Sequence, residues 1–203
     1  AGKDIALLSE YDDFGRPYRK FCPVPMTTST GAYASFSDIH PEILKFYNWE
    51  VYAFSKTLYD DSPLYRPVEE YGPGSPWHTR GKSVRTSYLV NDGSGLLSCS
   101  GYLVESDTSL TCVGILPSGN LRVEKKTDED GNVSLTFTDK LGRKTLERTV
   151  DGERYQDTYY VYDDLGLLRY VLTPEASAVM SSSGTFGDSS SPLSAQAYVY
   201  KYD

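Results

Sequence analysis

The residues that could form a reactive or ligand-binding site include a histidine next to a tryptophan, His78 and Trp77. An indole ring can stack on a sugar, and an imidazole can act as a base. No Ser or Cys lies near His78 in a recognised nucleophile motif, so a packed loop anchor is the simpler interpretation of this pair. Trp49 is the other tryptophan of the chain. Trp77, His78 and Trp49 are therefore the candidate ligand-binding residues, and the sequence identifies no catalytic residue.

The carboxylates occur as neighbours inside short turns, as at Asp12-Asp13, Asp60-Asp61 and Asp163-Asp164. Neighbouring side chains in a turn diverge and stay solvated, so a paired general acid and base is not predicted. The run from Asp128 to Asn132 offers several oxygen ligands, but its glycine is the fourth residue and the twelfth is Asp139. An EF-hand loop needs glycine at the sixth position and glutamate at the twelfth. This run is predicted to be a solvated turn.

The sequence predicts neither a metal nor a cofactor. Cys22, Cys99 and Cys112 form no C-x-x-C pair, and the chain has only two histidines, so a zinc site is not expected. Buried free thiols are the simpler state, although Cys99 and Cys112 could pair across neighbouring strands. The chain contains no phosphate-binding glycine motif, so a nucleotide-binding fold is not supported.

The composition excludes two classes of partner. The formal net charge is −8 and the pI about 4.8, whereas binding to a nucleic-acid backbone needs a basic face. The apolar runs are far shorter than the roughly 20 residues that span a bilayer, so membrane insertion is not predicted. The N-terminus has no basic stretch followed by an apolar core, so no signal peptide is visible. The 18 tyrosines suit half-buried sheet surfaces.

Most of the chain alternates short apolar-aromatic runs with turn clusters, which predicts a mainly β protein of antiparallel hairpins. One short helix is expected near residues 40–48, where apolar residues recur at helical spacing after Ser37, Asp38 and Pro41. Strands are expected at 52–60 and 64–71, and an irregular loop at 72–76.

Three segments follow from this pattern. Residues 1–35 form a first hairpin and a polar link, 36–83 hold the helix and the irregular loop, and 84–203 form a hairpin-rich β region. The serine-rich stretch 177–196 is expected to be a long mobile surface loop, because it has little to bury. A further copy of the repeated motif described next begins at Tyr202-Asp203, and both ends of the chain look like cuts in a longer protein.

One signature recurs: an aspartate three residues before a glycine, between aromatic-rich strands. The aspartate can accept backbone N–H groups inside a type I turn, and glycine takes the left-handed position that returns the chain. Such hairpins have one aromatic face and must stack on neighbours to bury it. The predicted turn residues are Asp12 and Gly15, Asp92 and Gly95, Asp139 and Gly142, and Asp163 and Gly166.

The segments YDDFGRP, TDKLGRK and TYYVYDDLGLLRYVLTP resemble the YD repeats of the Rhs family, with its Y-D-x-x-G-R-L core. The chain is similar to the N-terminal region of the large Rhs-repeat proteins of Bacteroidetes over about three quarters of its length. It departs from the pattern at Leu167, where the usual arginine is missing. It also departs at Asn91 and Thr138, which replace the tyrosine, and in the irregular spacing of the copies.

The resemblance implies YD-repeat hairpins stacked into a curved sheet, in an exported or surface protein. Its implied role is non-catalytic: a segment of a β-sheet shell that encloses a toxin or serves adhesion, with neighbouring repeats of the same parent chain as partners. The alternative is a carbohydrate- or cell-surface-binding module that uses exposed Tyr and Trp. The direction in which Trp49, Trp77 and the tyrosines point discriminates between the two.

Overall fold

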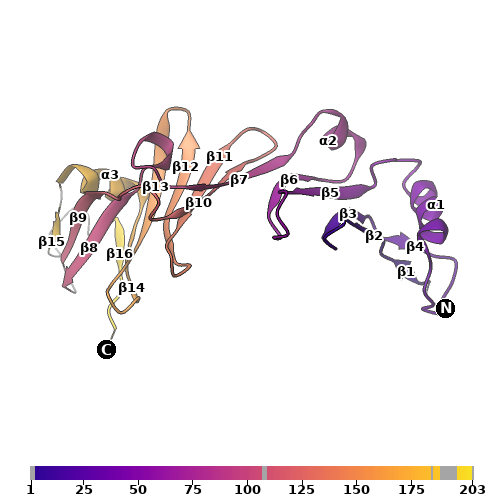
Figure 1. Cartoon of the computed structure of the whole chain (residues 1–203), viewed down its shortest axis with the longest axis horizontal. Helices are drawn as coiled ribbons and strands as arrows, with labels where there is room; N and C mark the ends of the chain where they lie inside the picture. Colours follow the sequence, from indigo (N-terminus) through magenta and orange to yellow (C-terminus); the bar gives the residue numbers. More distant parts are fainter. Residues whose placement is uncertain (1–2, 107–108, 184, 188–195, 203) are drawn as a thin grey trace. The chain divides into compact units, whose positions relative to one another are not determined.

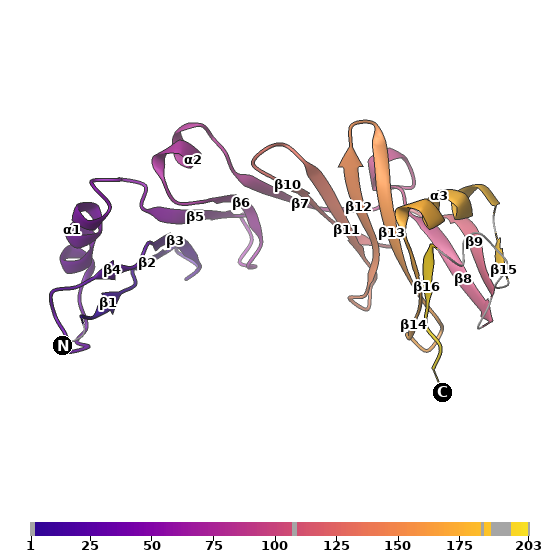
Figure 2. The same ribbon diagram turned by 180° about the vertical axis from the view of Figure 1, so that it is seen from behind.

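A computed structural model of the chain describes residues 3–106, 109–183, 185–187 and 196–202. The protein is mainly β, as predicted, with 44% of its residues in strands and 14% in helices. Its strands pair antiparallel, most of them with their neighbours in sequence (Figures 1 and 2). The chain divides into two compact units. Unit 1 comprises residues 1–86 and 127–131, and unit 2 comprises residues 87–126 and 132–203.

Unit 1 places two hairpins side by side, because the second strand of the first hairpin pairs with the first strand of the second. The predicted segments 1–35 and 36–83 therefore share one sheet. A separate two-stranded sheet pairs the segments on either side of the first hairpin. The strands of unit 1 are β1 (Ile5–Ala6), β2 (Ser9–Tyr11), β3 (Pro17–Phe21), β4 (Val24–Pro25), β5 (Phe54–Tyr59) and β6 (Pro67–Tyr71). Strand β7 (Val84–Val90) begins in unit 1 and ends in unit 2.

Helix α1 (Phe36–Phe46) is the helix expected near residues 40–48, but it begins four residues earlier. Ser35, and not Ser37 or Asp38, is its N-cap, because the Asp38 carboxylate accepts both the Ser35 N–H at 2.9 Å and the Ser35 hydroxyl at 2.6 Å. Ile39 and Ile43 lie on one helical face and are buried in the core of unit 1. That core also contains Phe21, Val24, Ala53 and Phe54.

The loop predicted at residues 72–76 is wrong in its second half, because helix α2 (Ser75–Thr79) begins there. Pro76 lies in the first turn, where its missing N–H costs nothing and its fixed φ suits the helix. Gly74, with φ of +108°, turns the chain into this helix.

Unit 2 joins a large antiparallel sheet to a smaller one. The larger contains the end of β7 with β10 (Arg122–Thr127), β11 (Val133–Thr138), β12 (Lys144–Asp151), β13 (Arg154–Tyr162), β14 (Leu168–Leu172) and β16 (Ala197–Val199). The smaller contains β8 (Ser100–Ser106), β9 (Ser109–Ile115) and β15 (Thr185–Gly187). A short 3-10 helix, η1 (Gly95–Leu97), precedes β8.

Alternate residues of the larger sheet form the core of unit 2. Leu135 and Phe137 on β11, and Leu146 on β12, are at most 1% exposed, while their neighbours in sequence are more exposed. This period of two places one face of the sheet toward the smaller sheet and leaves the other polar. Cys99 and Leu110 bring side chains from the smaller sheet region into the same core.

The serine-rich stretch does not begin as the predicted loop. Helix α3 (Pro174–Ser183) covers its first residues and packs on β13, β14 and β9. Ala176 and Met180, four residues apart, are fully buried in the core. Thr173 begins the helix by accepting the Ser177 N–H on its carbonyl at 2.8 Å. Residues 185–187 of the predicted loop form a short strand, and residues 184 and 188–195 lie outside the described residues.

The cysteines are free thiols: Cys99 is buried, and Cys22 and Cys112 are half-buried. A bond between Cys99 and Cys112 is therefore absent, and Cys112 pairs in register with Tyr102 instead. Among the described residues, no helix has the length and hydrophobicity needed to cross a bilayer.

Replacing Phe137 with Ala should lower the free energy of unfolding by about 3–5 kcal/mol, because it leaves a cavity in the middle of the unit 2 core. Leu141→Ala is the matched control, since Leu141 is 78% exposed in the adjacent turn and its loss should change stability by less than about 0.5 kcal/mol. Urea denaturation measures both. Equal losses would contradict the assigned register of β11.

Candidate functional site

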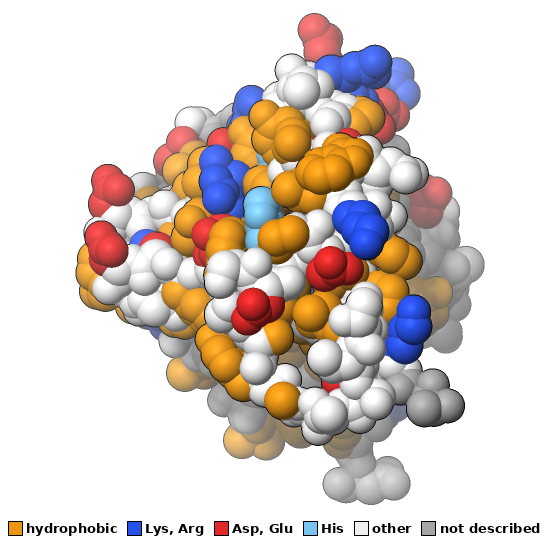
Figure 3. Space-filling view, turned by 90° about the vertical axis from the view of Figure 1, so that its right-hand side faces the viewer, with side chains coloured by type: hydrophobic (Ala, Val, Ile, Leu, Met, Phe, Trp, Pro, Cys, Tyr) orange, Lys and Arg blue, Asp and Glu red, His pale blue; other side chains and the backbone are white. Residues whose placement is uncertain are grey.

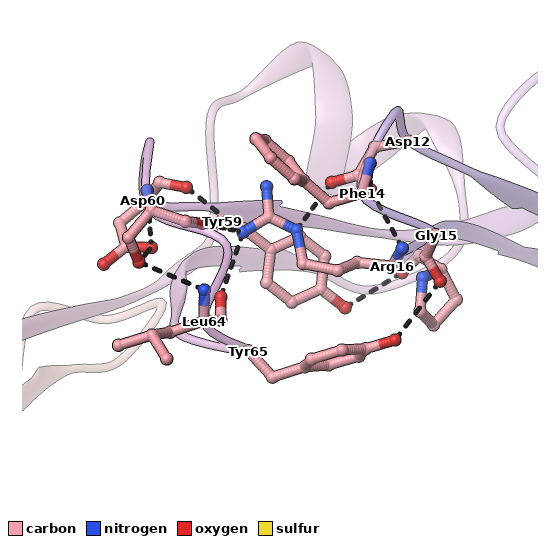
Figure 4. A network of polar contacts seen from close by, with 10 residues as sticks. Asp12, Phe14, Gly15, Arg16, Tyr59, Asp60, Leu64 and Tyr65 are labelled. Carbon is pink, nitrogen blue, oxygen red and sulfur yellow. Dashed lines mark hydrogen bonds and ion pairs between the residues drawn. The ribbon is translucent and has the colours of Figure 1, made fainter.

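The aspartate of the first repeated turn binds both the backbone and an arginine. Asp12 Oδ1 accepts the N–H groups of Phe14 at 3.0 Å and Arg16 at 2.9 Å, and Oδ2 accepts Arg16 Nε at 2.7 Å (Figure 4). The Gly15 N–H donates to the Asp12 carbonyl, and Gly15 has φ of +74°. One carboxylate therefore fixes the turn and orients the guanidinium that follows it.

Two turns in unit 2 repeat this geometry. Asp139 Oδ1 accepts Leu141 N–H and Arg143 N–H, both at 2.9 Å, and Oδ2 accepts Arg143 Nε at 2.7 Å. Asp163 Oδ1 accepts the N–H groups of Leu165 and Leu167 at 3.0 and 2.9 Å. Gly142 and Gly166 have φ of +82° and +83°. The interpretation of Asp12, Asp139 and Asp163 as turn residues therefore agrees with the geometry.

The turn at Asp163 lacks the usual arginine, because Leu167 stands in its place. Arg169, two residues further along β14, supplies the guanidinium instead, with Nη1 at 3.3 Å from Asp163 Oδ2. Residues two apart in a strand point to the same face, so Arg169 can reach the carboxylate that an arginine at position 167 would bind.

The proposed copy at Asp92 and Gly95 is a different structure. Asp92 Oδ1 accepts the Ser94 N–H, and the Asp92 N–H donates to Leu97, five residues on. Gly95, with φ of +53°, begins η1, and the chain then enters the smaller sheet and does not return along β7. Asp92 and Gly95 therefore do not close a hairpin. Of the four predicted copies, this one has neither a tyrosine before the aspartate nor an arginine after the glycine, and that combination is the sequence signal that separates it from the others.

A copy that the sequence analysis missed lies at Asp60. The Asp60 N–H donates to the Arg66 carbonyl, Asp60 Oδ1 accepts the Ser62 hydroxyl at 2.7 Å, and Arg66 lies 3.8 Å from Oδ2. The hairpin β5–β6 has a register shift next to Tyr59, as β2–β3 has next to Tyr11. The signal was the same Tyr-Asp-Asp and Arg-Pro pairs, with two extra residues between them.

Successive turns are joined by a contact that we call the Tyr–Arg interlock. In unit 1 the guanidinium of Arg16 lies 4.6 Å from the ring centre of Tyr59, and the Tyr59 hydroxyl donates to the Pro17 carbonyl at 3.1 Å (Figure 4). Tyr59 is the residue before Asp60, so the tyrosine of one turn covers the arginine of the turn before it. The cation–π contact and the hydrogen bond together fix the spacing of the two hairpins.

The Tyr–Arg interlock recurs twice in unit 2. Tyr162 lies over Arg143 at 4.8 Å and donates to the Lys144 carbonyl at 3.1 Å. Tyr202 lies over Arg169 at 5.9 Å and donates to the Leu168 carbonyl at 3.0 Å. In all three cases the accepting carbonyl belongs to the second residue after the turn glycine.

Arg16 has a further role in unit 1. Its side chain is almost fully buried, and Nη1 donates to the carbonyls of Asp60, Ser62 and Leu64 at 3.2, 2.7 and 3.0 Å. The longer Asp60 turn is thus folded around the guanidinium of the first turn. Tyr65 adds a hydrogen bond back to the Gly15 carbonyl at 3.2 Å.

The turn carboxylates are held in the charged form. Partial burial raises the pKa of Asp12 and of Asp139, but the hydrogen bonds from the following arginine outweigh it, and both pKa values lie below the ordinary one. The backbone N–H of Leu167 lowers the pKa of Asp163 in the same way. A carboxylate with a lowered pKa and occupied oxygens is poorly suited to act as a general acid or base at neutral pH.

Two of the candidate ligand-binding residues, Trp77 and His78, pack within the fold. The His78 ring is stacked between Tyr52 and Tyr71, with ring centres 4.5 and 5.3 Å away, and its Nε2 lies 3.4 Å from the Phe54 carbonyl. The imidazole is thus built into an aromatic stack that holds α2 against the sheet. Trp77 is 38% exposed and lies against Gly72 and Gly74, so the pair anchors the loop.

Trp49, just after α1, is 72% exposed. It has φ of +62° and follows Asn48 at +53°, so two successive residues occupy the left-handed region that side chains disfavour. The face in Figure 3 carries hydrophobic side chains around a histidine, with charged groups scattered among them. Trp49 is the more exposed of the two candidate tryptophans, at 72% against 38% for Trp77.

The sequence analysis also missed a buried ion pair in unit 2. Arg148, 3% exposed on β12, makes two bonds to Asp157 at 2.7 and 2.6 Å and donates to the Leu96 carbonyl at 2.8 Å. Because this guanidinium donates to a carbonyl of η1, the ion pair connects the larger sheet to the segment that leads into the smaller one. The regular alternation of β12 could have identified Arg148 as a core position.

Among the described residues, no cluster of three or more His, Cys, Asp or Glu side chains could hold a metal ion. In the turn at Asp128, Oδ1 accepts the Asp130 N–H and the Asp128 carbonyl accepts the Gly131 N–H. Asp130 faces Lys82 at 2.9 Å. These are the hydrogen bonds of a backbone turn and one surface ion pair.

The fold and the repeated turns define a mainly β protein in which hairpins are joined turn to turn by arginine and tyrosine. In comparisons with known families, residues 1–90 match the model of a domain of unknown function, DUF6443. The matched part contains the Asp12 and Asp60 turns together with Trp49, Trp77 and His78. No curated protein matches the chain.

Arg16→Lys should lower the free energy of unfolding by about 2–4 kcal/mol, because an ammonium cannot keep the carboxylate and the three carbonyls satisfied at once. Arg85→Lys is the matched control: the Arg85 side chain is 65% exposed, and its ion pair with Glu69 should be worth less than about 1 kcal/mol. Urea denaturation followed by tyrosine fluorescence measures both. If the two variants lose the same stability, Arg16 does not hold the turns together.

Asp139→Asn should reduce the dependence of stability on acid pH. The pKa of Asp139 is lowered by folding, so its contribution is complete above the ordinary value of 3.8 and disappears as the pH falls through the folded value. The variant should lose about 1 kcal/mol at pH 7 and lose less than the parent chain between about pH 5 and pH 2. Asp164→Asn, at an exposed neighbour of a turn aspartate, is the control. Parallel acid curves for parent and variant would contradict this role.

Proposed function

We propose that the chain is a non-catalytic structural segment of the β-sheet shell of a larger exported or surface protein of the Rhs/YD-repeat type. The observation that carries this proposal is the Tyr–Arg interlock, which recurs at Tyr59, Tyr162 and Tyr202. It gives every part of the Tyr-Asp-x-x-Gly-Arg motif a structural task. The aspartate fixes the turn, the glycine reverses the chain, and the arginine and tyrosine join one hairpin to the next.

The chemistry of the motif supports a scaffold. The repeated carboxylates accept backbone N–H groups and guanidinium N–H groups, which leaves them committed to the fold. An enzyme would need a group free to exchange a proton or attack a substrate. A β-sheet shell has a different requirement, because unpaired strand edges would pair with other chains. Contacts that join neighbouring hairpins keep those edges paired.

The resemblance to exported and surface proteins underlies the remaining parts of the proposal. The partners are neighbouring repeats of the same parent chain, in a secreted or cell-surface protein that encloses a toxin or takes part in adhesion. The three cysteines are free thiols, so the fold forms without a disulfide.

A second candidate function is a carbohydrate- or cell-surface-binding module. The exposure of Trp49 favours it, since an indole held by strained backbone at the end of a helix is available for stacking on a sugar. The stacking of His78 between two tyrosines argues against Trp77 and His78 as the platform. Trp49 is therefore the residue on which this alternative depends.

The chain should show no turnover in a screen of polysaccharide and peptide substrates. On a glycan array, the chain and its Trp49→Ala variant should show equally little binding. Trp77→Ala is the control, because it removes an indole that anchors a loop. Turnover that a single carboxylate or histidine substitution eliminates would overturn the scaffold proposal. Glycan binding that is lost in Trp49→Ala and kept in Trp77→Ala would establish the second candidate.

A further inference from the structure

The Tyr–Arg interlock has a direction. The tyrosine ends a strand, as at Tyr59 and Tyr162, or lies three residues after one, as at Tyr202. That strand pairs with the second strand of the hairpin before it. This holds for β5 on β3, β13 on β12 and β16 on β14. The preceding hairpin supplies a socket, which consists of the turn arginine and the carbonyl two residues after the glycine. The following hairpin supplies a plug, which is its tyrosine.

Tyr11 has the position of a plug without a socket. It ends β2, the first strand of the first hairpin, and precedes Asp12 as Tyr59 precedes Asp60. Its side chain is 62% exposed, against 50% for Tyr202, and Tyr59 and Tyr162 are half-buried. Within the described residues, the Tyr11 ring has no aromatic or cation–π partner and its hydroxyl has no hydrogen bond.

The strand that carries Tyr11 has an open edge. Among the strands that the structure describes, β2 ends its sheet and pairs with β3 alone. Leu8 and Asp12 bond toward β3, through Phe21 N–H to the Leu8 carbonyl and Asp12 N–H to the Arg16 carbonyl. Because antiparallel pairing alternates, the backbone groups of Ser9 and Tyr11 face away from β3. A second strand laid along β2 would find these groups and the tyrosine side by side.

Thr138 provides the contrast within the chain. It occupies the plug position of hairpin β11–β12, but its neighbour β10 does not follow an Asp-x-x-Gly-Arg turn. A threonine thus stands where no socket is present. Tyrosines stand at 59, 162 and 202, where a guanidinium is present. Each tyrosine with a partner thus lies on a guanidinium of the preceding hairpin, and Tyr11 has the same position without such a hairpin among the described residues.

We propose that the outer edge of β2, with Tyr11, is a docking surface for one more hairpin of the same kind. The partner hairpin contributes an arginine after an Asp-x-x-Gly turn and the open edge of its second strand. This inference rests on the proposed function, under which another part of the larger protein supplies that hairpin. The surface continues an interface that the chain itself forms three times.

The test uses a socket that the chain already contains. Deleting residues 197–203 removes β16 and Tyr202, and so uncovers β14 and Arg169; adding Tyr11→Ala to the deletion leaves a protein with a socket and no plug. Mixed with the intact chain, which has a plug and a filled socket, it should form a complex of one copy of each by light scattering. Each protein alone should stay monomeric.

Substitutions at the plug identify the contact. Tyr11→Ala in the intact chain should abolish the complex, and Tyr11→Phe, which keeps the ring but loses the hydroxyl, should weaken it about 5-fold. Tyr33→Ala, at a tyrosine that is 94% exposed in the segment before α1, should leave it unchanged. If the deletion variant does not fold by circular dichroism, Val199→Pro with Tyr202→Ala releases the same strand and keeps the chain length.

Three results would overturn the inference: no complex between folded proteins, a complex insensitive to Tyr11→Ala, or a dimer of the intact chain alone, which would mean pairing of two β2 edges. Binding of Tyr11 to a glycan in place of the socket protein would also count against it. None of these results would alter the effect of Arg16→Lys inside the chain. Failure of this docking surface is therefore distinguishable from failure of the scaffold proposal.

Discussion

The structure depends on one charged contact: an aspartate that accepts two backbone N–H groups with one oxygen and an arginine with the other. Each half alone would be weak, because an exposed turn frays and an exposed ion pair contributes little. Joined on one carboxylate, the turn orients the arginine and the arginine keeps the carboxylate ionised, as at Asp12 and Asp139. The lowered pKa of these aspartates is the electrostatic consequence of that arrangement.

The oriented guanidinium then determines how hairpins join. Its flat face receives the tyrosine of the next turn, and the tyrosine hydroxyl reaches a backbone carbonyl beside it. Strand pairing alone would leave neighbouring hairpins free to slip by two residues without exposing a core face. The Tyr–Arg interlock removes that freedom, since the ring and the hydroxyl fit in only one register. Tyrosine suits this role because phenylalanine could cover the arginine but could not bind the carbonyl.

The mainly β class, the hairpins at Asp12, Asp139 and Asp163 and the position of the first helix follow from the sequence, because turn chemistry and periodicity are local. The errors have local causes too. Asp60 was missed because two inserted residues separate it from its arginine, and Asp92 was assigned to the repeat because an Asp-x-x-Gly spacing without arginine also suits a 3-10 turn. The serines obscured helix α3: among its described side chains, only two apolar ones, Ala176 and Met180, are buried, and the helix packs on β13, β14 and β9, contacts that the local pattern does not reveal.

The substitution of Leu for Arg at position 167 shows what the repeat conserves physically. The turn keeps its aspartate, its glycine and both backbone hydrogen bonds without the arginine. Arg169 on β14 supplies the guanidinium instead, bonds to the Asp163 carboxylate and contacts the Tyr202 ring. The structure therefore requires a positive group between the carboxylate of one turn and the tyrosine of the next, from whichever strand position can reach that point. A repeat of this kind is defined by the place of its charges, and sequence spacing is only one way to put them there.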